Sequence, residues 1–268
     1  MASRNLRGSG EDQGLRVAEI DAENFDTLLC CGVKSPTHPG RMKKRRWLEA
    51  NAQCGLRAKT LLAPDGKPAG YIEAVPGESA WRGVNAENYL FIHCVWIYAK
   101  KYQKKGWGRT LVNTCIEDAR RAGKAGVAVI VRNGPWMADG RLFLDCGFKA
   151  VDTAAPDYTL LAYKLDKSAA GPSFKKDWDK KASRYGKGLT IIRSNQCPHI
   201  DKFATEIAEA ARTEFRIQPK VVELRSAAEA QNAPTPYAVF AVLYDGRVIA
   251  DHPISRTRFR NIMQKLAR

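Results

Sequence analysis

The sequence has no long apolar run and no paired-cysteine motif. Nowhere in its 268 residues is there a stretch close to the roughly 18 consecutive apolar residues of a membrane-spanning helix. Its seven cysteines include no CxxC spacing, and the adjacent Cys30 and Cys31 are a poor fit to disulfide geometry. These absences argue against a membrane protein, a zinc knuckle and a dithiol redox site. We therefore expect a reduced protein of the cytoplasm, with no membrane partner and no metal.

Acidic residues are scarce relative to basic ones. The 28 Asp and Glu residues are outnumbered by 44 Lys and Arg, and the formal net charge of +16 raises the question of a nucleic-acid partner. The basic residues form three separate clusters rather than one stripe, at 41–46, 100–105 and 167–187. Each cluster can equally be a solvated surface, and the first lacks interleaved aromatic side chains for stacking bases. The pattern argues against nucleic acid, with RNA binding by the third cluster as the remaining alternative.

The composition changes most strongly between residues 167 and 187. This stretch contains Gly171, Pro172 and scattered lysines but almost no aliphatic side chains, which is typical of a linker. Residues 1–14 are polar and indicate a flexible tail. The sequence thus predicts an N-terminal domain over 15–166, a basic linker over 167–187 and a smaller C-terminal domain over 188–268.

The N-terminal domain is expected to have a mixed α/β fold. Residues 88–98 form a nearly continuous apolar run, which suits a central strand buried on both faces. Alternation and turn residues predict further strands at 15–20, 59–63, 69–75, 127–131, 148–151 and 158–165. Helical spacing and stop signals predict helices at 24–30, 41–54, 108–121 and 139–146. The result is a sheet of about seven strands.

The loop between the central strand and the following helix combines glycine with positive charge. Free backbone N–H groups and the helix dipole at such a helix start suit a pyrophosphate. Gly106 and Gly108 allow close approach of the backbone, and Lys100, Lys101, Lys104 and Lys105 add charge. Taken alone, the segment can equally be a basic turn that binds no phosphate.

Two motifs resemble the GNAT acyltransferase family. The family loop Gln/Arg-x-x-Gly-x-Gly/Ala is matched at Gln103, Gly106 and Gly108, and its later helix running into Gly-Phe is matched from Leu142 to Phe148. The resemblance covers about residues 15–165. It implies acetyl-CoA as the acyl donor, direct transfer to an amine, and no metal. By the same resemblance, the pantetheine arm pairs with Trp96, Ile97 and Tyr98, and the pyrophosphate lies on Gln103, Lys104, Lys105, Gly106, Trp107, Gly108 and Arg109.

The sequence departs from this family at the general acid. Many members place a tyrosine four residues before the glycine of the Gly-Phe pair, where this chain has Phe143. Tyr158, Tyr98 and Cys146 are the alternatives. Many members also need no strong acid, because a CoA thiolate is a fair leaving group.

Glu73 and Glu78 are the candidate bases or amine-binding carboxylates. Alternation along the strand also permits a solvent-facing Glu73. On the central strand, His93 and Cys94 can form a satisfied core pair, or Cys94 can carry the acyl group if its thiol pKa is lowered. Trp81 and Arg82 are candidates for lining the acceptor pocket, although one buried tryptophan anchoring a loop explains them nearly as well.

The C-terminal domain has the element order of a thioredoxin fold. Cys197-Pro198 stands where that fold has its redox motif, and Thr235-Pro236 where it has a cis-proline. Ile200 occupies the place of the second cysteine, so a dithiol cycle is excluded. Cys197 remains a candidate substrate-binding or reactive thiol at a helix N-terminus, or a relic in a binding domain. The segments around Cys197 and Pro236 resemble the YoaP-type domain that follows a GNAT domain in some bacterial proteins.

Three functions are open on this sequence. The first is acetyl transfer from acetyl-CoA to a primary amine of a small molecule. The second is acetylation of a protein or peptide amine, with the C-terminal domain recruiting it. The third is a sensor that binds acetyl-CoA without turning it over, which the phenylalanine at Phe143 leaves open. A homodimer is compatible with each.

Overall fold

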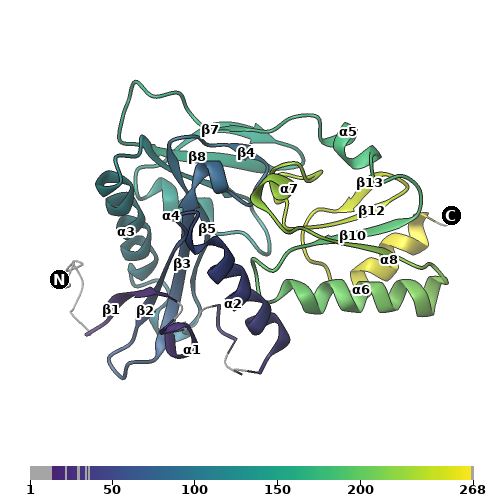
Figure 1. Cartoon of the computed structure of the whole chain (residues 1–268), viewed down its shortest axis with the longest axis horizontal. Coiled ribbons are helices and arrows are strands. Elements are labelled where there is room, and N and C mark those ends of the chain that lie inside the picture. The colour runs from purple at the N-terminus through teal and green to yellow at the C-terminus, as the bar shows by residue number, and fades with distance from the viewer. Residues whose placement is uncertain (1–13, 22, 29–30, 34, 36, 267–268) are drawn as a thin grey trace. The chain divides into compact units, whose positions relative to one another are not determined.

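The computed structural model describes residues 14–21, 23–28, 31–33, 35 and 37–266. The predicted tail over 1–14, apart from Gly14, and Cys30 therefore lie outside the described residues. The chain forms two compact units. Unit 1 contains residues 1–36, 48–78 and 86–173, and unit 2 contains residues 37–47, 79–85 and 174–268. Figure 1 labels the elements of both units.

Unit 1 contains the seven-stranded sheet that the sequence predicts. Its strands lie in the order β1 (Arg16–Ile20), β2 (Arg57–Leu62), β3 (Pro68–Pro76), β5 (Tyr89–Ile97), β6 (Gly126–Val131), β8 (Tyr158–Lys164) and β7 (Lys149–Ala154). Neighbouring strands are antiparallel except β5 and β6, which are parallel. The mixed α/β fold is therefore confirmed.

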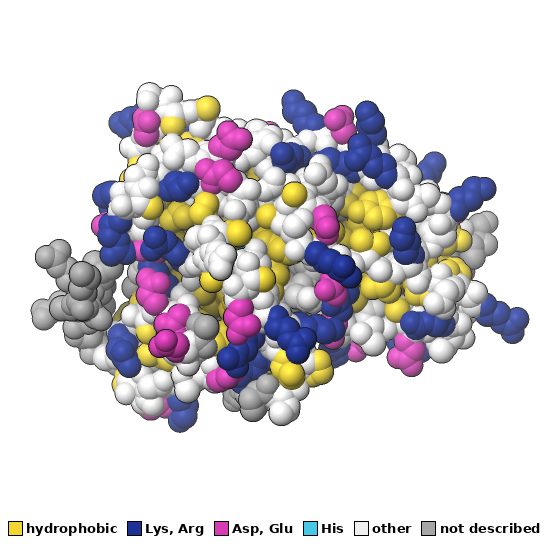
Figure 2. Space-filling model, viewed as in Figure 1, with side chains coloured by type: hydrophobic (Ala, Val, Ile, Leu, Met, Phe, Trp, Pro, Cys, Tyr) yellow, Lys and Arg dark blue, Asp and Glu magenta, His cyan; other side chains and the backbone are white. Residues whose placement is uncertain are grey.

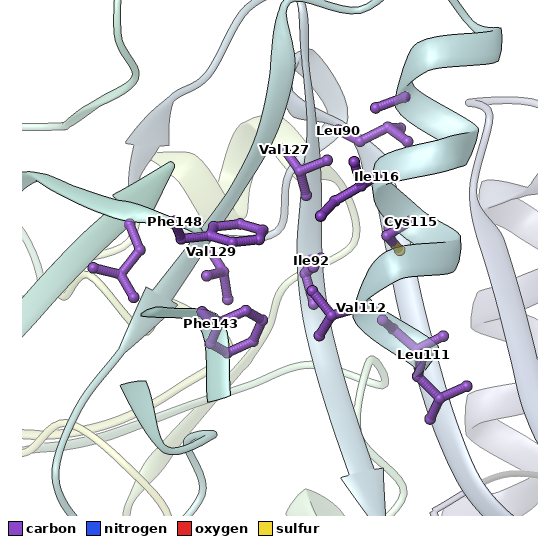
Figure 3. Packing of buried hydrophobic residues seen from close by; sticks show 14 of the residues in the cluster. Leu90, Ile92, Leu111, Val112, Cys115, Ile116, Val127, Val129, Phe143 and Phe148 are labelled. Carbon is purple, nitrogen blue, oxygen red and sulfur yellow. The ribbon is translucent and has the colours of Figure 1, made fainter. Parts of the chain in front are cut away.

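The core of unit 1 lies between helix α3 (Trp107–Arg121) and the centre of the sheet. Apolar side chains recur at helical spacing along α3, so one of its faces is buried. Figure 3 shows that face against β5 and β6, with Phe143 of α4 (Gly140–Leu144) and Phe148 close by. The packed residues include Leu90, Ile92, Leu111, Val112, Cys115, Ile116, Val127 and Val129. This packing fixes the start of α3 at one end of β5.

The N-terminal part of the chain also contains three short helical elements. Helix α1 (Phe25–Leu28) lies inside the predicted 24–30 helix, and η1 (Gly77–Ser79) and η2 (Lys100–Tyr102) are 3₁₀ turns. The β2–β3 turn closes on Gly66, which has a φ of 77° and donates its N–H to the carbonyl of Ala63 at 2.9 Å. The strands predicted at 59–63 and 69–75 are therefore joined by a tight turn as an antiparallel pair.

Unit 2 contains a four-stranded sheet and the longest helix of the chain's described part. The strands lie in the order β11 (Lys220–Glu223), β10 (Leu189–Arg193), β12 (Phe240–Tyr244) and β13 (Arg247–Ala250), and only β10 and β11 are parallel. The helices are α6 (Ile200–Phe215), α7 (Ala227–Gln231) and α8 (Arg256–Leu266). This is the element order that the sequence predicts, and the thioredoxin resemblance remains a prediction.

One detail of that resemblance is wrong. Among the described residues, the single cis peptide bond joins Ala155 to Pro156. The Thr235–Pro236 bond is not cis, although Thr235 is buried and its hydroxyl accepts the N–H of Ala238 at 3.1 Å.

The units do not follow the linear domain boundaries. Residues 37–47, which include the start of α2 (Pro39–Ala52), and residues 79–85, which include β4 (Val84–Asn85), group with the C-terminal part. The predicted linker holds β9 (Ser173–Phe174) and α5 (Trp178–Ser183), in which Lys181 and Ala182 are buried. None of the helices in the described ranges combines the length and the apolar character that crossing a membrane requires.

Candidate functional site

The two central strands of unit 1 are hydrogen-bonded to each other only along the first part of β5. Their parallel pairing runs from Tyr89 opposite Gly126 to Ile92 opposite Val129 and stops there. Both strands continue, β5 to Ile97 and β6 to Val131, while β5 keeps its pairing with β3. Within the described residues, β5 therefore has no strand partner on its β6 side after Ile92. An open strand edge offers N–H and C=O groups to an extended ligand.

The glycine-rich loop lies at the outer end of this edge. The side-chain amide of Gln103 donates to the carbonyl of Ile97 at 2.7 Å, which ties the loop to the end of β5. Gly106 caps α3 in the left-handed conformation, with a φ of 86°. A Cβ there would meet no atom within 4 Å, so the backbone conformation, rather than space, requires glycine. The first N–H groups of α3 have no partner inside the helix and point toward this turn.

The loop also carries exposed positive charge. Lys104, Lys105 and Arg109 are exposed, and Trp107 is half-buried. Gly108 is close to α4, since a Cβ there would lie 3.3 Å from Cδ1 of Leu142. Exposed cations around a helix N-terminus fit an anionic phosphate group, as the loop chemistry predicts.

The three residues expected to pair with the pantetheine arm differ in exposure and in their backbone hydrogen bonds. Trp96 is 44% exposed, whereas Ile97 and Tyr98 are half-buried. The N–H of Tyr98 already donates to the carbonyl of Ala69 at 3.1 Å, and the carbonyl of Ile97 accepts from Gln103. These two hydrogen bonds occupy backbone groups at the outer end of the edge.

Glu73 is fully buried, so the solvent-facing alternative is wrong. The hydroxyl of Tyr71 donates to its Oε2 at 2.6 Å, and Nδ1 of His93 lies 3.1 Å from its Oε1. These three side chains come from neighbouring strands β3 and β5. They form a polar group within a largely apolar sheet.

Glu78 has a different environment. It is exposed in η1 and accepts the N–H of Asn88 at 2.9 Å, with Nζ of Lys124 at 3.4 Å. Partial burial alone would raise the pKa of its carboxyl, but the hydrogen bond from Asn88 and the Lys124 ammonium outweigh it and lower that pKa. A lowered pKa makes a weaker base, so the geometry favours a structural ion pair for Glu78.

The candidate acids and the candidate acyl carrier lie in separate places. Tyr158 is buried, and Nη1 of Arg132 donates to its hydroxyl at 3.1 Å. Phe143, at the position of the usual tyrosine acid, is fully buried in the apolar core and has no proton to donate. Burial raises the pKa of the Cys146 thiol. Cys94 is half-buried and stands directly opposite Glu73 in the β3–β5 register.

The predicted acceptor residues belong to unit 2. Trp81 is buried and its ring meets that of Trp47 edge-on at 5.3 Å. Arg82 is buried too, lies 5.1 Å from the ring of Tyr237 and reaches Oε1 of Gln196 at 3.4 Å. The structure thus brings Arg82 to the residue before the half-buried Cys197.

Sequence reasoning missed that two cations of the 41–46 cluster, Arg41 and Lys44, are buried. Lys44 has no exposed surface, donates to the carbonyl of Gln196 at 2.5 Å and lies 4.2 Å over the ring of Trp47. The 41–46 cluster is therefore not a uniformly solvated surface. The available signal in the sequence was the i, i+3 spacing of Lys44 and Trp47, which places the two side chains next to each other on a helix.

Both the N-terminal and the C-terminal part of the chain match models of known protein families. A model described as the acetyltransferase (GNAT) family matches residues 23–148, and one described as YoaP-like matches residues 219–261. The uncharacterized N-acetyltransferase YoaP of Bacillus subtilis (strain 168) is 30% identical over 260 residues, which are 93% of this chain and 98% of that protein. The chain belongs to the GNAT acetyltransferase family. The resemblance that the two motifs predict is therefore confirmed, including the YoaP-like C-terminal part.

Two solved structures of putative acetyltransferases share less sequence identity with this chain. The putative acetyltransferase yncA from Salmonella typhimurium, solved with acetyl-CoA, is 20% identical with a TM-score of 0.42 and covers 58% of this chain and 96% of its own. A putative streptothricin acetyltransferase from Bacillus anthracis, solved with acetyl coenzyme A, is 15% identical with a TM-score of 0.40 and covers 57% and 99%. Within the described part of this GNAT chain, no group of three or more His, Cys, Asp or Glu could hold a metal.

Proposed function

We propose that this protein transfers the acetyl group of acetyl-CoA directly to the primary amine of a small molecule. The proposal depends on one observation. Strands β5 and β6 separate after Ile92, and the open edge of β5 leads to the basic, glycine-capped start of α3. An open strand edge that ends at an anion-binding helix start suits a donor with an extended amide arm and a pyrophosphate.

The open edge of β5 extends over several residues. From His93 to Tyr98 a strand advances five residues, or about 16 Å at about 3.3 Å per residue. We assign the pyrophosphate to the N–H groups and cations from Gln103 to Arg109, and the arm to the edge formed by Cys94, Val95, Trp96 and Ile97. The thioester would then lie at the inner end, near Ile92, where the strands separate.

A proton acceptor for the amine is needed at that inner end. Two carboxylates in the described part of unit 1 have no exposed surface, Glu73 and Asp118. Asp118 pairs with Lys59 and Arg121, so its charge is neutralised. Glu73 instead bonds to the phenol of Tyr71 and the imidazole of His93. We therefore assign proton handling to Glu73 and its partners rather than to Glu78.

Direct transfer is favoured over an acyl-cysteine intermediate. Cys94 would be the carrier, but it stands opposite the carboxylate of Glu73. Reactive thiolates lie next to a cation or a helix N-terminus, whereas the register places a glutamate opposite Cys94. The position of the usual tyrosine acid is apolar, so the thiolate leaves without a proton from Phe143.

The acceptor class is tested with a panel of substrates. Release of CoA thiol is measured with small primary amines and with lysine-containing and free N-terminal peptides at matched concentrations. We expect small amines to give the higher kcat/KM, because the buried Glu73 side chain admits a slender amine more readily than a folded chain. Higher kcat/KM with peptides would move the assignment to protein or peptide acetylation. A one-acetyl mass increase of the enzyme with donor alone would contradict direct transfer.

A further inference from the structure

Trp96 is the one exposed residue of strand β5, whose other residues are buried or half-buried. It is 44% exposed and lies beyond Ile92, in the part of β5 where the pairing with β6 has ended. A single exposed apolar side chain is common on protein surfaces. This one, however, borders the strand edge to which the arm of acetyl-CoA is assigned above. Its indole therefore lies beside the place where the donor and the acceptor must meet.

A bulge in β5 determines which face of the sheet carries this indole. The register against β3 shifts between Ile92 and Cys94, so His93 is an extra residue in the strand. Ile92 belongs to the core cluster beneath α3, and beyond the bulge Val95 packs against that cluster. Since side chains alternate along a strand, Trp96 projects from the opposite face. Without the extra residue, the alternation would turn Trp96 into the core.

The indole is also held from two sides. Its ring meets that of Tyr98 edge-on at 5.6 Å. A Cβ on Gly32 would lie 3.5 Å from Cζ3 of the indole, so the backbone at that glycine is close to the ring. Opposite Trp96 on β3, Tyr71 is fully buried, so exposure on this face increases toward the open edge. A ring that is fixed before binding loses little freedom when a ligand covers it.

We propose that Trp96 selects the acceptor, because its indole packs against the apolar body of a primary amine that carries a hydrocarbon chain or a ring. The proposal deepens the acetyl transfer proposed above and rests on it. The donor arm pairs with backbone groups and so lies in the plane of the sheet, whereas the indole projects from that plane. Trp96 thus contacts the donor through its backbone and the acceptor through its side chain.

The position of Trp96 also sets the length of the acceptor. The thioester is assigned to the region of Ile92, four residues and no more than about 13 Å from Trp96 along the strand. An amine whose nitrogen is at the thioester therefore reaches the indole only with a chain of several carbons. Ethylamine is too short for this contact, whereas the chain of octylamine extends to the indole.

The test measures kcat/KM for ethylamine, butylamine, hexylamine and octylamine with the full-length protein. In the wild type, kcat/KM should rise by about tenfold or more along the series. Trp96→Ala should lower kcat/KM about tenfold for octylamine and less than about twofold for ethylamine, and Trp96→Phe about threefold for octylamine alone. Val151→Ala is the control and should leave the series unchanged, because Val151 is 38% exposed on β7 at the end of the same sheet. Calorimetry should give the same Kd for acetyl-CoA with every variant.

The outcomes separate this proposal from the one on which it rests. Thermal midpoints show which variants fold, and Trp96→Phe decides if Trp96→Ala does not fold. An unchanged preference for octylamine in the deciding variant overturns the role of Trp96. Equal losses for all four amines with weaker acetyl-CoA binding also overturn it, because the indole would then serve the donor. A wild-type protein that acetylates all four amines equally keeps the acetyl transfer and overturns only the selection by Trp96. Binding of acetyl-CoA without release of CoA with any amine contradicts the acetyl transfer and this proposal together.

Discussion

At the scale of single residues, burial rather than residue type decides which cysteine can react. Six cysteines lie in the described residues, and they range from buried to exposed. Burial in the core raises the pKa of Cys115 to about 12, with Lys59 and Asp118 acting in opposite directions. Cys54 is exposed beyond the end of α2. Since the thiolate is the nucleophile, these two residues should differ strongly in reactivity.

We predict that iodoacetamide at pH 8 modifies Cys54 and leaves Cys115 unmodified in the folded protein. At that pH a thiol with a pKa of about 12 is ionised to only about one part in 10,000, and its burial also blocks access. Peptide mapping by mass spectrometry after a short exposure measures both sites. The same reaction in urea is the control, where both should be modified. Equal modification of both sites in the folded protein would contradict the packing of α3.

At the scale of elements, the start of helix α3 has two roles. It begins a helix of the core, and it lies in the loop assigned to donor binding. Gly106 before the helix and Gly123 after it both have positive φ, at 86° and 63°, and a Cβ at either would meet no atom within 4 Å. The two glycines therefore match in backbone conformation and in free space, and they differ only in which end of α3 they adjoin. Only Gly106 lies in the loop assigned to the pyrophosphate.

We predict that Gly106→Ala and Gly123→Ala each cost about 1 kcal/mol of stability, because alanine is strained in the left-handed region. Only Gly106→Ala should weaken acetyl-CoA binding, by about tenfold if one charge-assisted hydrogen bond is lost. Calorimetry gives the Kd values and denaturant unfolding gives the stabilities. Equal Kd values for the two variants would exclude this loop from donor binding.

Helices α6 and α8 are joined by a surface ion-pair cluster. Glu214 accepts hydrogen bonds from Arg260 and Arg256, which lower its pKa to about 2 from the ordinary 4.5. A depressed carboxyl pKa contributes stability above about pH 4.5, and that contribution is lost as the pH falls toward about 2. The effect is modest because the group is at the surface.

We predict that Glu214→Gln lowers the urea midpoint of unfolding at pH 7 and that the difference from wild type shrinks below about pH 4.5. Glu206→Gln on the same helix is the control, since Glu206 faces Lys202 one turn away at 3.7 Å. Its effect should be smaller at pH 7. A difference for Glu214→Gln that is the same at pH 3 and pH 7 would contradict the assigned ion pairs.

Local elements could be predicted from the sequence, whereas the state of the site residues could not. The strands and α3 follow from alternation, helical spacing and glycine stop signals, which are properties of short segments. Alternation places Tyr71 and Glu73 on one face of β3 but does not say whether that face is covered. The bulge at His93 has no glycine to signal it and depends on pairing with β3. Buried Glu73 and its bond to His93 therefore needed the tertiary structure.

At the scale of the whole molecule, contacts distant in sequence define the two units. Lys43 pairs with Asp201 at 2.5 Å across 158 residues, and Lys44 reaches Gln196 across 152. Composition along the chain cannot show such contacts, which is why residues 37–47 and 79–85 were expected in the N-terminal domain. Figure 2 shows Lys and Arg side chains spread over the visible face rather than collected in one patch.

The most direct test of the account measures CoA thiol and N-acetylated product in the same reaction. Purified full-length protein is given acetyl-CoA and the best small primary amine of the panel, and both products are quantified over time. We predict equal molar amounts of the two, each dependent on enzyme, donor and amine. Tight binding of acetyl-CoA without amine-dependent release of CoA would contradict acetyl transfer and identify the protein as a sensor of acetyl-CoA.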